Sequence, residues 1–210
     1  MRNATKVFAT IMIVALVTGL AAYVEAQQRG GRGNMTPGQR AERAERQRLE
    51  IEHMYAMERP IEALDSVWIE ELTWMEVRDA IAGGKTTAIV STGGVEQNGP
   101  FLATGKHNYV LQGACEGIAR KLGNALCAPI IKLVPEGAYD PPSGAMRYPG
   151  TISLRQETFE AVLEDVGMSL KTAGFENIVL IGDSGGNQRG MEAAAALLDE
   201  RWTDARAYFI

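Results

Sequence analysis

The chain has 210 residues, a formal net charge of −5 and 46% hydrophobic residues, which is enough for a globular domain with a buried core. The acidic balance, and the absence of a polybasic patch beyond the N-terminal region, argue against nucleic acid as a partner. The two cysteines, Cys115 and Cys127, are too few for a zinc ribbon or a disulfide scaffold. We expect them to be buried free thiols, and a disulfide in an oxidising compartment is the alternative.

Residues 1–26 have the features of a signal peptide. Arg2 and Lys6 begin the segment, Val7 to Ala22 form its apolar part, and small residues lead to a cleavage site after Ala26. The segment predicts a periplasmic or secreted domain that no longer contacts the membrane after cleavage. An uncleaved anchor is the alternative, because the apolar run approaches the ~18 residues that span a bilayer.

Residues 27–64 are expected to form a linker and a charged helix. Gln27 to Gly38 are rich in glycine and arginine, which cannot form a core. Gln39 to Met57 alternate arginine with glutamate, a pattern typical of a solvated helix held by near-neighbour ion pairs. We expect His53 within it to be a surface histidine, and Pro60 to lie beyond the end of the helix.

Residues 65–210 alternate helical and strand patterns and form the predicted main domain. The expected helices are Met75–Ala82, Asn108–Leu122, Arg155–Ala173 and Gln188–Trp202, and the expected strands are Thr86–Val90, Ala125–Val134, Asn177–Ile181 and Arg206–Ile210. Continuous apolar strands that alternate with helices predict an α/β fold, a mostly parallel sheet between two helical layers. No helix follows the last strand, so we expect the domain to be incomplete at its C-terminus.

Three loops at one edge of this sheet carry the polar residues. The first strand leads into a glycine-rich loop with Glu96, Asn98 and His107, and the third leads into Gly182–Asn187. A proline-rich loop, 135–149, contains Glu136, Tyr139 and Asp140 and is expected beside them. Open α/β sheets place their chemistry at the carboxyl ends of the strands, so the loops together predict the functional site.

The motifs in these loops resemble the creatininase (creatinine amidohydrolase) family. They are EQNGP at 96–100, YPGTISL at 148–154 and GDSGGN at 182–187, in the family's order and spacing, and the resemblance covers about residues 68–210. It implies a three-layer α/β/α fold and a homo-oligomer. It also implies a site with one or two metal ions that hydrolyses the amide C–N bond of a small molecule.

The ligand positions that the resemblance implies are only partly kept. Glu96 matches the family's first metal ligand, whereas Asn98 and Ser184 stand where the family has ligand histidines. His107 stands at the position of an aspartate that bridges two ions, and Gly186 where some members have a carboxylate. One imidazole nitrogen cannot bridge two ions, so we expect a single divalent ion, zinc or manganese.

The resulting prediction is an amidohydrolase that uses one metal ion. Glu96, His107 and Asp183 are the expected metal ligands and catalytic residues, and Ser184 is a further catalytic candidate. The residues expected to shape the substrate site are Asn98, Tyr139, Gly185, Gly186 and Asn187.

Two alternatives remain. The first is a metal-free relative that binds a ligand or has a structural role. The second is a serine hydrolase, because residues 182–186 match the Gly-x-Ser-x-Gly motif around Ser184, although no histidine follows this serine in the chain.

Overall fold

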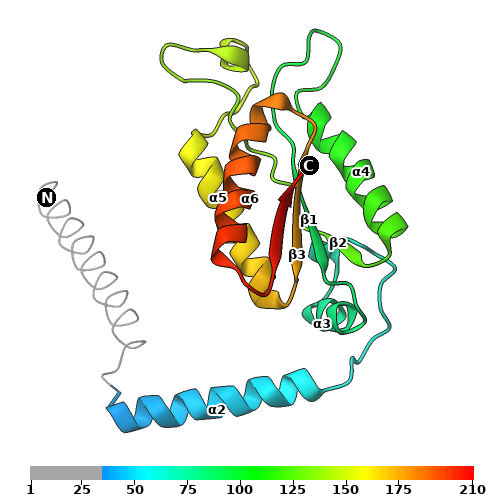
Figure 1. The fold of residues 1–210 in the computed structure, drawn as a ribbon, viewed down its shortest axis with the longest axis vertical. Helices are drawn as coiled ribbons and strands as arrows, with labels where there is room; N and C mark the ends of the chain where they lie inside the picture. The colour runs from blue at the N-terminus through cyan, green and yellow to red at the C-terminus, as the bar shows by residue number, and fades with distance from the viewer. Residues whose placement is uncertain (1–34) are drawn as a thin grey trace, which may run out of the picture. The chain divides into compact units, whose positions relative to one another are not determined.

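The computed structural model describes residues 35–210 (Figure 1). The predicted signal peptide, 1–26, and the first part of the linker lie outside the described residues. The chain divides into two units, residues 1–58 and 59–210, and each is described by itself.

The described part of the first unit is a single exposed helix, α2 (Pro37–Ala56). Thr36 caps it: its side chain accepts from the backbone N–H of Gln39, whose own side chain accepts from the N–H of Thr36. Arg48 pairs with Glu45 and Glu52 one turn to either side, as the alternating charges predict. His53 is exposed, also as expected. No helix within residues 35–210 is both long and apolar enough to cross a membrane.

The second unit is built around a four-stranded parallel sheet with the order β2-β1-β3-β4. The strands are β1 (Thr87–Thr92), β2 (Ala125–Cys127), β3 (Asn177–Gly182) and β4 (Arg206–Phe209). The helices are α3 (Trp74–Ala82), α4 (Lys106–Leu122), α5 (Gln156–Ala173) and α6 (Gln188–Arg201), with short 3-10 turns η1 (Ile69–Glu71), η2 (Gly144–Arg147) and η3 (Gly185–Asn187).

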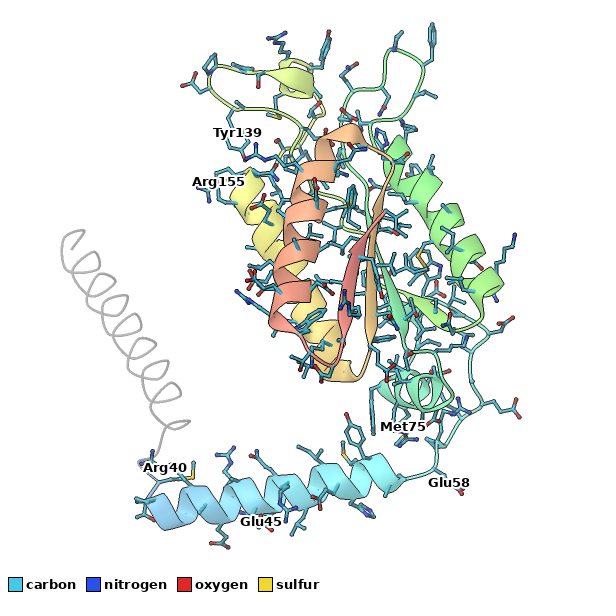
Figure 2. All side chains as sticks on the ribbon, viewed as in Figure 1. Arg40, Glu45, Glu58, Met75, Tyr139 and Arg155 are labelled. Atoms are coloured by element: carbon cyan, nitrogen blue, oxygen red, sulfur yellow. A yellow bond between two sulfur atoms is a disulfide. The ribbon has the colours of Figure 1, made fainter. Side chains whose placement is uncertain are left out.

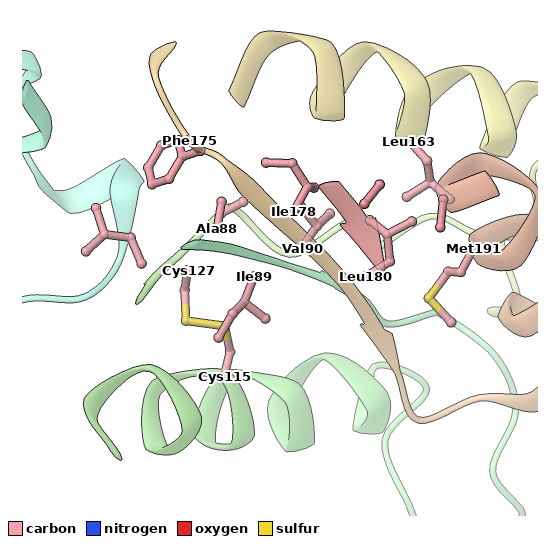
Figure 3. Close-up of a cluster of buried hydrophobic side chains, with 14 of the residues drawn as sticks. Ala88, Ile89, Val90, Cys115, Cys127, Leu163, Phe175, Ile178, Leu180 and Met191 are labelled. Carbon is pink, nitrogen blue, oxygen red and sulfur yellow. A yellow bond between two sulfur atoms is a disulfide. The ribbon is translucent and has the colours of Figure 1, made fainter. Parts of the chain in front are cut away.

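Helices cover both faces of the sheet. Helices α5 and α6 lie on one side and α4 on the other (Figures 1 and 3). Strand β1 is buried along its whole length, and Leu180 of β3 faces the layer that contains Leu163 and Met191. The predicted three-layer α/β/α architecture is therefore confirmed.

The register of the sheet brings two polar loops together. Thr87 pairs with Asn177 at one end of β1 and β3, and Thr92 pairs with Gly182 at the other. The two strands end level, so the loop after Thr92 and the loop after Gly182 leave the sheet side by side.

The second strand is shorter than predicted. Regular pairing ends at Cys127. Beyond it, an isolated bridge joins Ile131 to Thr92 of β1, and another joins Val134 to Ser153, which lies outside the sheet. Pro129 explains the break, because proline has no N–H to donate to a neighbouring strand.

The buried face of α4 is not its most apolar stripe, which is formed at helical spacing by Val110, Ala114, Ile118 and Leu122. The helix instead buries His107, Leu111, Cys115 and Ala119. The two sets differ by one residue, or about 100° around a helix. The observed set begins with a polar residue, because the first turn of α4 faces the loops rather than the apolar core.

Cys115 and Cys127 form a disulfide, so the expectation of two free thiols is wrong. Both residues are fully buried, and their Cα atoms are 6.2 Å apart where α4 packs on β2 (Figure 3). This distance is within the range that a disulfide spans. The bond fixes α4, the helix that carries His107, to the sheet.

Glu76 fastens the segment before α3 to that helix. Its carboxylate accepts hydrogen bonds from the backbone N–H of Leu64 at 2.6 Å, and from the N–H and hydroxyl of Thr73, both at 2.7 Å. Thr73 in turn caps α3, so that Thr73 and Glu76 form a capping box. These donors hold the pKa of the Glu76 carboxyl below its usual value, and the N–H of Leu64 contributes more than Thr73.

Candidate active site

His107 lies between two carboxylates at the carboxyl edge of the sheet. Its Nε2 is 2.8 Å from Glu96 Oε1, and its Nδ1 is 2.7 Å from Asp183 Oδ1. The imidazole side chain is only 6% exposed, whereas those of Glu96 and Asp183 are 20% and 25% exposed. Three predicted site residues from two loops and a helix therefore form one hydrogen-bonded chain.

Two asparagines hold the loop that carries Glu96. Asn108, next to His107 in α4, accepts from the N–H of Gly94 at 3.2 Å and donates to its carbonyl at 2.9 Å. Asn187 is fully buried and donates to the carbonyls of Gly93 and Thr92 at 2.8 and 3.0 Å. A Cβ on Gly93 would lie 2.0 Å from Asn108 Oδ1, so only glycine allows this approach. Asn187, expected near the substrate, binds the backbone of this loop.

Glu136, from the proline-rich loop, is the site residue that the sequence least distinguishes. It is 8% exposed, and its Oε1 receives no hydrogen bond from residues 35–210. The pKa of the Glu136 carboxyl is raised to about 8. Burial is the largest cause, followed by the charge of Glu96 and a hydrogen bond to that residue. The sequence shows a carboxylate beside proline and glycine, and nothing in that pattern indicates that its side chain points inward.

Asn98 and Tyr139, two residues expected to contact substrate, make local hydrogen bonds. Asn98 donates to the carbonyl of Glu96 at 3.0 Å, so it orders the loop rather than standing beside Glu96 as a ligand. The hydroxyl of Tyr139 donates to the carbonyl of Ser153 at 3.2 Å. Tyr139 and Arg155, both labelled in Figure 2, line a hollow of about 530 Å³ beside the proline-rich loop.

The turn after β3 contains the remaining predicted residues. Gly185 has open space around it, and a Cβ on Gly186 would lie 3.2 Å from the carbonyl of Pro135, so this turn packs against the proline-rich loop. Ser184 precedes η3 in an extended conformation. Both ring nitrogens of His107 are bound by carboxylates, so His107 is not placed as the base of a Ser184 nucleophile.

Side chains that can bind a metal ion are present, but they are not arranged around a single position. Within residues 35–210, no three His, Cys, Asp or Glu side chains form a ready metal shell. Asp183 contacts Nδ1, and the two ring nitrogens of His107 point in opposite directions. Asp183 and Nε2 therefore cannot hold the same ion. A carboxylate on Nδ1 is the usual outer partner of a ligand histidine, because it leaves the Nε2 lone pair free for the metal. Glu96 and His107 Nε2 therefore fit a metal ion as adjacent donors.

Comparison with known proteins agrees with the fold and with the motifs. The family model described as creatininase (creatinine amidohydrolase) matches residues 70–209. A creatinine amidohydrolase from Pseudomonas putida is 27% identical over 116 residues, which are 55% of this chain and 44% of that protein.

Two solved creatininase structures are also similar. One is a mutant of the Zn-Zn type, with a TM-score of 0.59, and the other is a manganese form, with a TM-score of 0.60. Each is 24% identical and is matched over 70% of this chain and 58% of its own. The chain thus spans about half the length of the relatives that it matches.

Proposed function

Because the chain belongs to the creatininase family, we propose that it hydrolyses a C–N bond in a small-molecule amide and uses one divalent metal ion. The observation that carries this proposal is the pairing of Glu96 with Nε2 of a buried histidine whose Nδ1 is held by Asp183. This combination is the arrangement of an inner ligand pair with an outer carboxylate.

Each residue of the chain has a distinct part in this proposal. Asp183 accepts the proton of Nδ1 and so fixes both the tautomer and the orientation of His107. Glu96 and His107 would hold zinc or manganese, which supplies a Lewis acid and a bound water with a pKa lowered to ~7. His107 turns only one nitrogen toward Glu96, which supports one ion rather than the bridged pair of a two-metal site.

The proposal also includes the setting of the protein. We expect a periplasmic or secreted location, for which the predicted signal peptide and the disulfide between Cys115 and Cys127 are the support. We expect a small-molecule substrate, and the homo-oligomer implied by the family remains a prediction.

A second candidate is a metal-free relative that binds a ligand without hydrolysing it. The observation that favours it is the hydrogen bond between each ring nitrogen of His107 and a carboxylate, so that both nitrogens already have a partner. The site would then be an ionic network that stabilises the loops.

An assay against a panel of cyclic and linear amides separates these candidates. The full chain is purified, treated with chelator, and assayed before and after addition of manganese or zinc. We expect hydrolysis of at least one amide that depends on the added metal and disappears in Glu96→Gln. Activity that is unchanged by the chelator and is lost in Ser184→Ala would instead support the serine hydrolase.

A further inference from the structure

We infer that Glu136 is the third protein donor of the metal site, so that Glu96, His107 and Glu136 bind the ion and Asp183 remains outside. This inference rests on the proposed function. It identifies the donor that the chain uses at a site where Asn98, Ser184 and Gly186 replace the ligands that the family resemblance implies.

Glu136 buries a carboxyl oxygen that has no hydrogen-bond partner within residues 35–210. The residue is only 8% exposed, and no donor within residues 35–210 forms a hydrogen bond to its Oε1. A carboxyl oxygen without a partner is costly to bury, and native proteins pair such atoms with a donor, a water or an ion. Its orphaned oxygen therefore points to a ligand.

A second carboxyl group lies next to that of Glu136. The neighbouring group is the carboxyl of Glu96, within hydrogen-bonding reach, and Glu96 Oε1 is in turn 2.8 Å from His107 Nε2. Two adjacent carboxylates repel each other unless a proton or a cation lies between them. A cation bound here relieves that repulsion and exchanges the hydrogen bond between His107 and Glu96 for coordination.

Backbone hydrogen bonds hold Glu136 in this position. Its N–H donates to Ser153 Oγ at 2.9 Å, and its carbonyl accepts from Ala145 at 3.0 Å. Gly94 adjoins the carboxyl with φ +154°, and a Cβ there would lie 2.4 Å from Glu136 Oε1. The absence of a side chain at Gly94 therefore makes room for the carboxyl of Glu136 beside the loop that carries Glu96.

The three donors are two carboxylates and an imidazole, each from a different segment. Carboxylates suit manganese and imidazole suits zinc, so the set suits the ions named for the solved relatives. Three protein ligands with an open position for water is also the usual arrangement of a catalytic metal.

The test is titration calorimetry of the full chain with manganese and with zinc, using the wild type, Glu136→Gln and Glu136→Asp. We expect Glu136→Gln to weaken binding by more than about 100-fold, since loss of an outer partner alone costs 10- to 100-fold. Glu136→Asp, which keeps the charge on a shorter side chain, should lie between the two. Glu200→Gln is the matched control, because it removes one exposed carboxylate at the far end of α6.

Two other outcomes separate the inference from the function on which it rests. If the wild type binds one ion and Glu136→Gln binds it as tightly, the inference is overturned and the metal-dependent function stands. If the wild type binds no ion of either kind, the metal-dependent function fails and the inference fails with it. Thermal unfolding of each variant in chelator establishes that it is folded.

Discussion

Two buried glutamates of the second unit are treated in opposite ways. Glu76 is 6% exposed and accepts three hydrogen bonds, from Leu64 and Thr73, which lower the pKa of its carboxyl. Glu136 is 8% exposed, has an oxygen that receives no hydrogen bond from residues 35–210, and lies against Glu96, which contributes to the raised pKa of its carboxyl.

The difference shows what each carboxylate does. The donors around Glu76 replace the water that it loses on burial, so its charge stabilises the cap of α3 without any ligand. Glu136 has a carboxylate neighbour instead of donors, an arrangement that favours a bound cation. One glutamate belongs to the architecture and the other to the proposed site.

The largest expected effect is a loss of hydrolysis when a residue of the proposed metal site is replaced. His107→Ala removes an inner ligand and leaves Glu96 and Asp183 without their common partner. We expect amide hydrolysis to fall by more than about 10³-fold, because both the metal and its activated water depend on this ligand. Steady-state rates on the best amide from the panel measure the loss, and Glu200→Gln should retain the wild-type rate.

Removal of the disulfide should lower stability and leave the site intact. Cys115 and Cys127 are 12 residues apart, and a cross-link over such a short loop contributes about 3 kcal/mol. The double variant Cys115→Ala/Cys127→Ala should therefore unfold at a temperature lower by roughly 5–10 °C. Its metal affinity at 25 °C, measured on the folded protein, should match the wild type. A large loss of affinity would mean that the bond also positions His107.

Asp183 tests the outer part of the site. Asp183→Ala should weaken metal binding by about 10- to 100-fold, because His107 loses the partner that fixes its tautomer. Asp183→Asn keeps an acceptor for the Nδ1 proton and should recover part of this affinity. Equal affinity in all three proteins would show that Asp183 does not orient the histidine.

Glu76→Gln should change the pH dependence of stability and leave metal binding unchanged. The pKa of Glu76 is lower in the folded state, so its contribution is complete above the unfolded value of ~4.3 and is lost as pH falls through the folded value. Thermal unfolding at a series of pH values should show a lower midpoint than the wild type at neutral pH and a smaller gap in acid. A constant gap across the acid range would contradict this role of the charge.

The smallest effect is expected from the cap itself. Thr73→Ala removes the side chain that caps α3 and one donor to Glu76. An N-cap of this kind contributes about 1 kcal/mol, so the midpoint of unfolding should fall by roughly 2–4 °C. Thr172→Ala, an exposed threonine in the last turn of α5, is a control outside any cap.

The strand order and layers of this domain follow from local patterns, whereas parts of the core do not. Apolar runs separated by amphipathic helices are enough to predict a parallel sheet with its loops at one edge. Local apolarity does not identify the buried face of α4, because the stripe from Val110 to Leu122 is more apolar than the buried face, which includes His107 and Ala119. The disulfide depends on the distance between α4 and β2, which local sequence does not contain.

Some residues of the candidate site are also predictable from local patterns, and others are not. Glu96, His107 and Asp183 follow strands or begin a helix, so their meeting at one edge is predictable from the alternation of elements. The sequence also predicts Asp183 as an inner ligand, which the opposite directions of the two ring nitrogens disfavour. The inward position of Glu136 is set by contacts with Ser153 and Gly94, which are distant in sequence, and no local pattern indicates it.

We propose above all that this chain binds one divalent ion and hydrolyses an amide with it. The most direct measurement is a titration of chelator-treated protein with manganese or zinc, in which bound metal and amide hydrolysis are followed together. We predict that activity rises in proportion to bound metal and reaches its maximum at about one ion per chain, as a single catalytic site requires. Less than about a tenth of an equivalent bound, with no gain in hydrolysis at any metal concentration, would contradict the claim.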